Sequence, residues 1–246
     1  MSLLFHGLLT IILTLLTQIG GLCWLAALPF RHRVPVFLGL YVAASLAAIW
    51  IAPMTGRGLV ACGNEGALRS ASWVHCALNR SYATPEMAAV LDDLAVDMDA
   101  RFPGTQTLLL DANFPFLTGF PLLPHLSHDD GEKADIAFYY AGPDGYMPGR
   151  LRSPIGYFAF QPGPSDCQPR RLTLRWDLTW LQPLWPDHDL DQDRTATALR
   201  TLIADPRVDR LFIEPHLRNS LGVMDPKLRF QGCRAARHDD HIHLQL

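Results

Sequence analysis

The sequence predicts an α+β protein, in which a small, mainly antiparallel sheet with flanking helices carries a metal site behind an N-terminal two-helix transmembrane hairpin. Three observations lead to this prediction. Residues 3–30 and 34–53 contain no Asp, Glu, Lys or Arg. The rest, about 190 residues of ordinary polarity, mixes short strand-like segments with stretches of helical period. The chain ends in a histidine-rich strand. We therefore expect a hairpin anchor over residues 1–55 and one external domain over residues 56–246.

Both apolar runs are long enough to cross a membrane, which takes about 20 residues. The link between them, Arg31-His32-Arg33, is basic, and basic loops favour the cytoplasm. We therefore expect a multi-pass protein of the inner (plasma) membrane, held through residues 3–53, with both chain ends and the C-terminal domain on the external or periplasmic side. A cleaved signal peptide fits less well, because the first residues lack Lys and Arg. A buried helical hairpin of a soluble fold is the other alternative.

The cysteines are compatible with an oxidising compartment for the domain. Cys23 lies within the first apolar run and is expected to be an apolar filler. The other four cysteines allow three pairings, of which we expect Cys62 with Cys76 and Cys167 with Cys233. The net charge of −3 argues against nucleic acid as a partner, which would call for a basic stripe.

Within the domain, local signals predict the elements in order. Thr84 before Pro85 is typical of a helix start, and apolar residues then recur at helical spacing until Pro103. Hydrophobic periodicity also predicts a helix over residues 194–204 and strands over residues 107–111, 134–140, 171–178 and 210–214. The Gly- and Pro-rich residues 142–169 are expected to form a loop or flap near a cleft. Three tryptophans are expected in the core: Trp176, Trp180 and Trp185.

The last strand carries the chemistry-bearing motif HDDHIHLQL. Because side chains alternate along a strand, His241 and His243 would share one face while Ile242 enters the core. Two imidazoles on one face can address one metal ion. A histidine-rich surface tail or a cloning tag is the alternative interpretation, so the motif needs further ligands.

A second segment supplies them. His128 and Asp135 are separated by a turn containing Gly131, and Asp135 stands at the start of an expected strand. An imidazole and a carboxylate from here, with one imidazole from the terminal strand, would leave a fourth position free, as catalytic zinc sites do. Each half also has an ordinary alternative, since acidic runs are commonly solvated loops and Asp commonly caps turns.

The two segments resemble the zinc motifs of the penicillin-insensitive murein endopeptidases, which belong with lysostaphin, D-alanyl-D-alanine peptidases and the hedgehog domain to one superfamily. The pattern S-H-x-x-G-x-x-A-D occupies residues 127–135, and H-D-D-H-x-H occupies residues 238–243. His125, three residues before the first motif histidine, and the segment 205–215 extend the resemblance. It covers the last third to half of the chain.

The resemblance implies that His128, Asp135 and His243 hold Zn²⁺. It makes His241 the neighbouring base or transition-state stabiliser, with a fourth ligand as the alternative role. His125 and His238 would line the same cleft.

The chain also departs from the family. Arg237 stands where the family usually has Gly, and the loop between His128 and Asp135 is unusually charged. Of the family's further metal contacts, Asp187 and His188 are only a weak counterpart. We expect Asp239 and Asp240 to orient imidazoles rather than to bind metal.

The function that the resemblance implies is that of a membrane-anchored zinc metallopeptidase hydrolysing amide bonds in peptidoglycan cross-links. Within enzymes, a D,D-carboxypeptidase or a dipeptidase is the alternative. Outside them, the alternative is a zinc-dependent cell-wall binding or sensing module without turnover.

Overall fold

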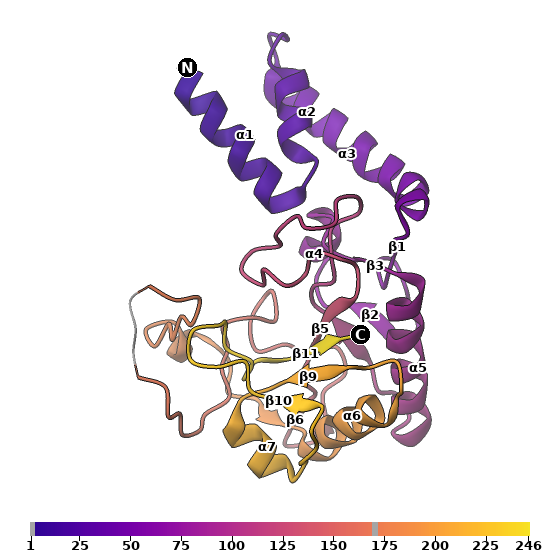
Figure 1. The fold of residues 1–246 in the computed structure, drawn as a ribbon, viewed down its shortest axis with the longest axis vertical. Helices are drawn as coiled ribbons and strands as arrows, with labels where there is room; N and C mark the ends of the chain where they lie inside the picture. The colour runs from indigo at the N-terminus through magenta and orange to yellow at the C-terminus, as the bar shows by residue number, and fades with distance from the viewer. Residues whose placement is uncertain (1–2, 169–171) are drawn as a thin grey trace.

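The computed structural model describes residues 3–168 and 172–246 and has an α+β fold. Three N-terminal helices form a bundle at one end of the molecule, and the sheets and remaining helices form the domain at the other (Figure 1). The helices of the described residues are α1 (Leu3–Thr17), α2 (Gly20–Ala27), α3 (Arg33–Ile51), η1 (Ala52–Thr55), α4 (Trp73–Ala77), α5 (Pro85–Arg101), η2 (Gln182–Leu184), α6 (Gln192–Ala204) and α7 (Pro215–Leu221).

The main sheet has six strands in the order β10-β9-β11-β5-β4-β2. They are β2 (Leu68–Ser70), β4 (Thr107–Leu109), β5 (Lys133–Ala137), β9 (Arg210–Phe212), β10 (Leu228–Arg229) and β11 (His241–Gln245). Smaller sheets pair β1 (Gly58–Leu59) with β3 (Tyr82–Ala83), and β6 (Tyr140–Gly142) with β7 (Gly145–Tyr146) and β8 (Asp189–Leu190).

The prediction of a small, mainly antiparallel sheet is therefore wrong, because the main sheet has six strands and is mixed. Its centre, β4-β5-β11-β9, is antiparallel, but both outer pairs, β2-β4 and β9-β10, are parallel. In each outer pair a helical connection returns the chain to the same end of the sheet, as parallel strands require. These edge strands have two or three residues, too few to show an alternating pattern in the sequence.

Helices α5 and α6 cover one face of the main sheet. The apolar stripe of α5, including Leu91 and Met98, packs with Leu199 of α6 against Ile136 and Ile242 of the central strands. Thr84 caps α5 by accepting a hydrogen bond from the amide of Met87, and the sequence predicted this helix correctly. The core thus lies on one side of the sheet, leaving the opposite side of β11 for its histidines.

A long flap, of which the structure describes residues 147–168 and 172–188, lies on that opposite side. Tyr157 packs there with Leu108, Leu110 and Ala137. The strand predicted over residues 171–178 is wrong over residues 172–178, which lie in no strand, and Arg171 lies outside the described residues. The core placement of the tryptophans is also wrong for Trp176 and Trp180, which are 47% and 72% exposed.

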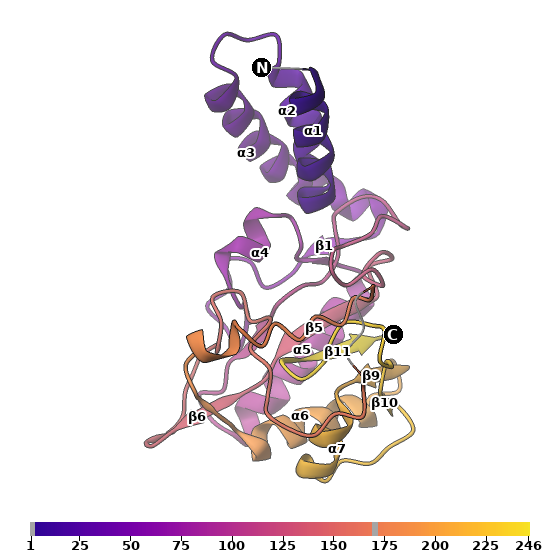
Figure 2. The ribbon, with the colours of Figure 1, turned by 90° about the vertical axis from the view of Figure 1, so that its left-hand side faces the viewer.

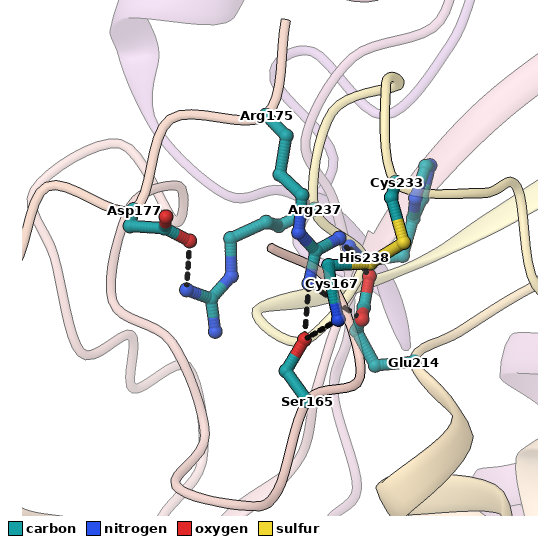
Figure 3. The surroundings of a disulfide bond; sticks show 8 residues. All are labelled: Ser165, Cys167, Arg175, Asp177, Glu214, Cys233, Arg237 and His238. Carbon is teal, nitrogen blue, oxygen red and sulfur yellow. Dashed lines mark hydrogen bonds and ion pairs between the residues drawn. A yellow bond between two sulfur atoms is a disulfide. The ribbon is translucent and has the colours of Figure 1, made fainter. Parts of the chain in front are cut away.

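The flap is held by cross-links rather than by strand pairing, as Figure 3 shows. Cys167 forms a disulfide with Cys233, and Arg175 donates two hydrogen bonds of 2.9 Å to the buried carboxylate of Glu214. Arg237 pairs with Asp177 at 2.9 Å. The second predicted disulfide, Cys62–Cys76, is confirmed as well, and Cys23 is free and buried.

The N-terminal bundle differs from the predicted two-helix hairpin. The first apolar run turns back at Gln18 and Ile19, so that α1 and α2 lie side by side with His6 packed 5.7 Å from Trp24 (Figure 2). The N-terminus therefore lies beside Arg33, at the end of the bundle away from the domain, whereas two full spans would put it at the domain.

Two glycines explain the turn. The Thr17 hydroxyl accepts a hydrogen bond of 2.8 Å from the amide of Gly20. A Cβ on Gly21 would lie 1.9 Å from the Thr14 hydroxyl oxygen, so only glycine lets α2 approach α1 this closely. Among the described residues, one helix, Arg33–Thr55, is long and apolar enough to cross a membrane, and it lies near the N-terminus.

Candidate metal centre

Six predicted site residues meet in one cluster on the flap side of the sheet. The donor atoms of His125, His128 and Asp135 lie within 4.8 Å of one another, as do those of His238, His241 and His243. All six side chains are buried. Either group could hold a metal ion, and the two groups are in contact.

Strand register brings Asp135 to His243. In the antiparallel pair β5-β11, Asp135 lies directly opposite His243, while the following pair, Ile136 and Ile242, faces the core. The alternation that the motif predicted is therefore present. A one-residue slip would move both ligands into the core.

His128 completes a triangle with these two residues. Its Nε2 lies 3.1 Å from His243 Nδ1 and 3.2 Å from Asp135 Oδ1, and the last two atoms are 2.7 Å apart. A tetrahedral zinc ion with bonds of about 2.0–2.1 Å holds its ligand atoms about 3.3 Å apart. The triangle is thus close in size to one face of such a site. The donor set fits a metal, although its identity is left open by geometry alone.

The two predicted ligand imidazoles, His128 and His243, are oriented by contacts of the ring nitrogens that face away from the centre. His128 Nδ1 donates to the carbonyl of Ala112 at 2.5 Å, which leaves Nε2 facing the centre. The outer nitrogen of His243, Nε2, lies 2.8 Å from the side-chain amide of Gln245.

The pKa values of the two predicted ligand imidazoles, His243 and His128, are shifted in opposite directions. Burial lowers the pKa of His243 to about 4, so this ring is neutral near pH 7. Burial also opposes charge on His128, but the Asp135 carboxylate outweighs it and raises the pKa of His128.

Asp135 uses its two oxygens differently. Oδ1 faces the triangle, whereas Oδ2 accepts hydrogen bonds from the Tyr157 hydroxyl at 2.7 Å and from His125 Nδ1 at 2.5 Å. Burial alone would raise the pKa of this carboxyl, but the surrounding imidazoles, His128 foremost, hold it well below its usual value. The sequence placed His125 in the cleft, and the structure shows it hydrogen-bonded to Asp135, one of the three predicted ligands.

His241 presents a free nitrogen to the centre. Its Nδ1 lies 2.5 Å from Asp240 Oδ1, and its Nε2 lies 3.5 Å from Asp135 Oδ1. This buried Nε2 has no hydrogen-bond partner within residues 3–168 and 172–246. Burial opposes protonation of His241, but Asp135 and Asp240 outweigh it and raise its pKa to about 9.

Of the other residues expected around the site, some take the predicted role and others do not. Asp240 orients an imidazole as expected, but Asp239 does not, because its carboxylate pairs with Arg237 instead. His238 packs 4.9 Å from the ring of His241, and burial together with its histidine neighbours depresses its pKa well below the usual value. A cavity of about 90 Å³ borders His238, His125 and His243.

Asp187 and His188 lie apart from the cluster. The side chain of Asp187 is 99% exposed and 3.7 Å from Arg152, and the His188 ring packs 6.5 Å from that of Tyr140. Neither residue belongs to a metal-binding group in the part of the chain that the structure describes.

Sequence reasoning missed a buried network beneath the centre. Asp111 accepts two hydrogen bonds of 2.7 Å from Arg80 and one of 2.9 Å from His75 Nδ1. The backbone carbonyl of Asp111 in turn accepts the amide of Asp135 at 2.7 Å. Burial alone would raise the pKa of Asp111, but Arg80 outweighs it and lowers that pKa. Single Arg, Asp and His residues outside a motif give no sequence signal for such a network.

A second missed feature is a clamp on the loop that carries His125 and His128. Arg57, two residues after the end of η1, donates to the carbonyl of Phe114 at 2.6 Å, to the Thr118 hydroxyl at 3.0 Å and to the carbonyl of Asp129 at 3.0 Å. These contacts join the start of the loop to the residue after His128. From the bundle, the Gln18 side-chain oxygen accepts the amide of Phe116 at 2.9 Å.

No protein family model matches this chain, and no curated protein matches it. The assignment of the centre therefore depends on its own geometry.

Proposed function

We propose that the chain is a zinc-dependent peptidase, anchored in the plasma membrane, that hydrolyses amide bonds in peptidoglycan cross-links. The observation that carries this proposal is the convergence of His128, Asp135 and His243 on one point beside the unpaired nitrogen of His241. Two imidazoles and a carboxylate are a typical catalytic ligand set for zinc, which keeps one position open. The substrate class rests on the resemblance of both motifs to murein endopeptidases.

The chemistry needs few parts. His128, Asp135 and His243 would hold a zinc ion, which would lower the pKa of a bound water from about 15.7 to about 7 and polarise the scissile carbonyl. His241 Nε2 then holds the proton that the leaving amine needs, while Asp240 fixes the ring through Nδ1. His125 and Tyr157 keep Asp135 Oδ1 aimed at the centre by occupying Oδ2.

The membrane placement rests on α3 and η1. We propose that Arg33–Thr55 crosses the bilayer with the basic link at its cytoplasmic end, which puts the domain outside. The two disulfides support an oxidising compartment for the domain.

A closed, non-catalytic zinc site is the second candidate. It is favoured by the position of His241, whose Nε2 lies 3.5 Å from Asp135 Oδ1 and could join His128, Asp135 and His243 as the fourth ligand that closes a zinc site. In that case His241 would be a ligand rather than an acid–base group.

The two candidates separate in one set of variants of the full chain in nanodiscs. His128→Ala and His243→Ala are expected to lose zinc, whereas His241→Ala keeps zinc and loses cleavage of cross-linked muropeptides by about a hundredfold to ten-thousandfold. His188→Ala is the matched control and keeps both properties. Wild-type protein that binds zinc but leaves muropeptides unchanged, with or without chelator, would refute the peptidase proposal.

A further inference from the structure

Helix α4 (Trp73–Ala77) has an apolar outer face that the fold leaves uncovered. Trp73 is 79% exposed and Ala77 is exposed, while Val74 and Leu78 are half-buried beside them. The inner face of the helix carries the buried His75, which binds Asp111 beneath the metal centre.

Hydrogen bonds fix α4 against the middle of the proposed membrane helix. The Tyr41 hydroxyl donates to the carbonyl of Ala77 at 2.6 Å. The Asn79 side chain donates to the Tyr41 hydroxyl at 2.9 Å and to the Ser45 hydroxyl at 3.1 Å. The contact therefore joins the domain to α3 itself and not to a linker after it.

The position of this contact along α3 sets its depth. At 1.5 Å per residue, Tyr41 and Ser45 lie about 12 and about 18 Å along the helix from Arg33. The hydrocarbon core is about 30 Å thick. With Arg33 at the cytoplasmic boundary, Ala77 and Asn79 meet α3 about 12–18 Å inside the external boundary, and a tilt of the helix places the contact deeper still.

An apolar groove adjoins this contact and shares Ser45 and Asn79 with it. Trp50 of α3 is 81% exposed and lies about 26 Å along the helix from Arg33, near the external boundary, where tryptophan is enriched. The groove of about 320 Å³ between α3 and β1 is lined by Leu46, Ile49 and Leu59, and the Cys62–Cys76 disulfide forms part of its wall.

We propose that the domain is seated in the outer leaflet of the membrane through the exposed face of α4, with a lipid acyl chain in the groove between α3 and β1. The inference rests on the membrane anchoring proposed above and does not depend on the metal. His75 of α4 is hydrogen-bonded to the side chain of Asp111, and the backbone carbonyl of Asp111 accepts the amide of Asp135. The contact of α4 with lipid would therefore also fix the height of the metal centre over the lipid surface.

Three tryptophans of similar exposure provide the test: Trp50, Trp73 and Trp180 are 81%, 79% and 72% exposed. The full chain in nanodiscs of phosphatidylcholine and phosphatidylglycerol is treated with hydroxyl radicals, and oxidation is measured at each tryptophan by mass spectrometry. Without lipid contact, all three would be oxidised at similar rates. We expect Trp50 and Trp73 to be oxidised several-fold more slowly than Trp180, which lies on the flap.

The possible results distinguish the contact of α4 with lipid (the seat) from the anchoring of the chain by α3 (the anchor). Protected Trp50 with Trp73 oxidised as fast as Trp180 overturns the seat and leaves the anchor standing. Unprotected Trp50 overturns both. Zinc content and muropeptide cleavage, measured on the same nanodiscs, report on the proposed reaction independently of either result.

A second measurement uses brominated lipids, which quench tryptophan fluorescence on contact. Trp73→Phe is expected to remove more of the quenchable emission than the matched variant Trp180→Phe. Equal losses from the two variants would contradict the seat.

Discussion

Replacing Tyr157 by Phe removes one hydroxyl group from behind the metal centre and little else. The hydroxyl donates a hydrogen bond of 2.7 Å to Asp135 Oδ2, and Tyr157 is fully enclosed between the flap and the sheet. Phe keeps the ring and opens no large cavity. Asp135 would then be held on that side by His125 alone.

The expected loss of zinc affinity follows from the negative charge on the acceptor, the Asp135 carboxylate. A hydrogen bond to a charged group contributes about 1.5–3 kcal/mol. If that energy serves to aim the carboxylate, its loss weakens zinc binding by about 10-fold to 100-fold, at about 1.4 kcal/mol for each factor of ten. Removing a partner of a metal ligand typically has an effect of this size.

The assay is zinc affinity by competition with a chromophoric chelator, beside the free energy of unfolding of the metal-free chain. Tyr139→Phe is the matched control, because Tyr139 is equally buried but shares its hydroxyl with Thr107 at 2.9 Å in the core. We expect both variants to lose stability and only Tyr157→Phe to lose zinc affinity. Unchanged affinity in Tyr157→Phe would refute the assigned role of this hydroxyl.

Two further predictions concern the loop clamp and pH. Arg57→Ala removes three hydrogen bonds to buried oxygens, so thermal or urea unfolding should show that the free energy of unfolding falls by about 3 kcal/mol. Competition with a chelator should show weaker zinc binding. The surface variant Arg207→Ala should change neither quantity, and equal behaviour of the two variants would contradict the clamp. In the metal-free chain the pKa of the ligand His128 is raised, so zinc must displace its proton, and zinc affinity should rise between pH 6 and pH 8 by up to about tenfold per unit. The raised pKa of His241 stabilises the metal-free fold below about pH 6.5, and this stability is lost as pH rises through about 9. A zinc affinity independent of pH would contradict this assignment of protons.

The parts of the fold that were predictable from the sequence are those with strong local signals. Helix α5 begins with a Thr–Pro cap and repeats apolar residues at helical spacing, and it forms where expected. The alternation in HIHLQL places Ile242 in the core and its neighbouring histidines on the other face. Both signals are short-range, and the tertiary structure does not override them.

The features that were missed depend on long-range contacts. The edge strands β2 and β10 are too short to show their direction, which the helical connections set. The break between α1 and α2 has one local sign, the Gly20-Gly21 pair, but an uncharged run conceals it. Tyr157 reaches Asp135 only because the flap folds over the sheet, so no spacing in the sequence relates the two.

The most direct test of the metal centre is anomalous diffraction at the zinc edge from crystals of the zinc-loaded protein. We expect one peak, about 2.0–2.1 Å from His128 Nε2, Asp135 Oδ1 and His243 Nδ1, with His241 outside bonding distance. A peak bonded to His238, His241 and His243 without Asp135, or no peak at the cluster, would contradict it.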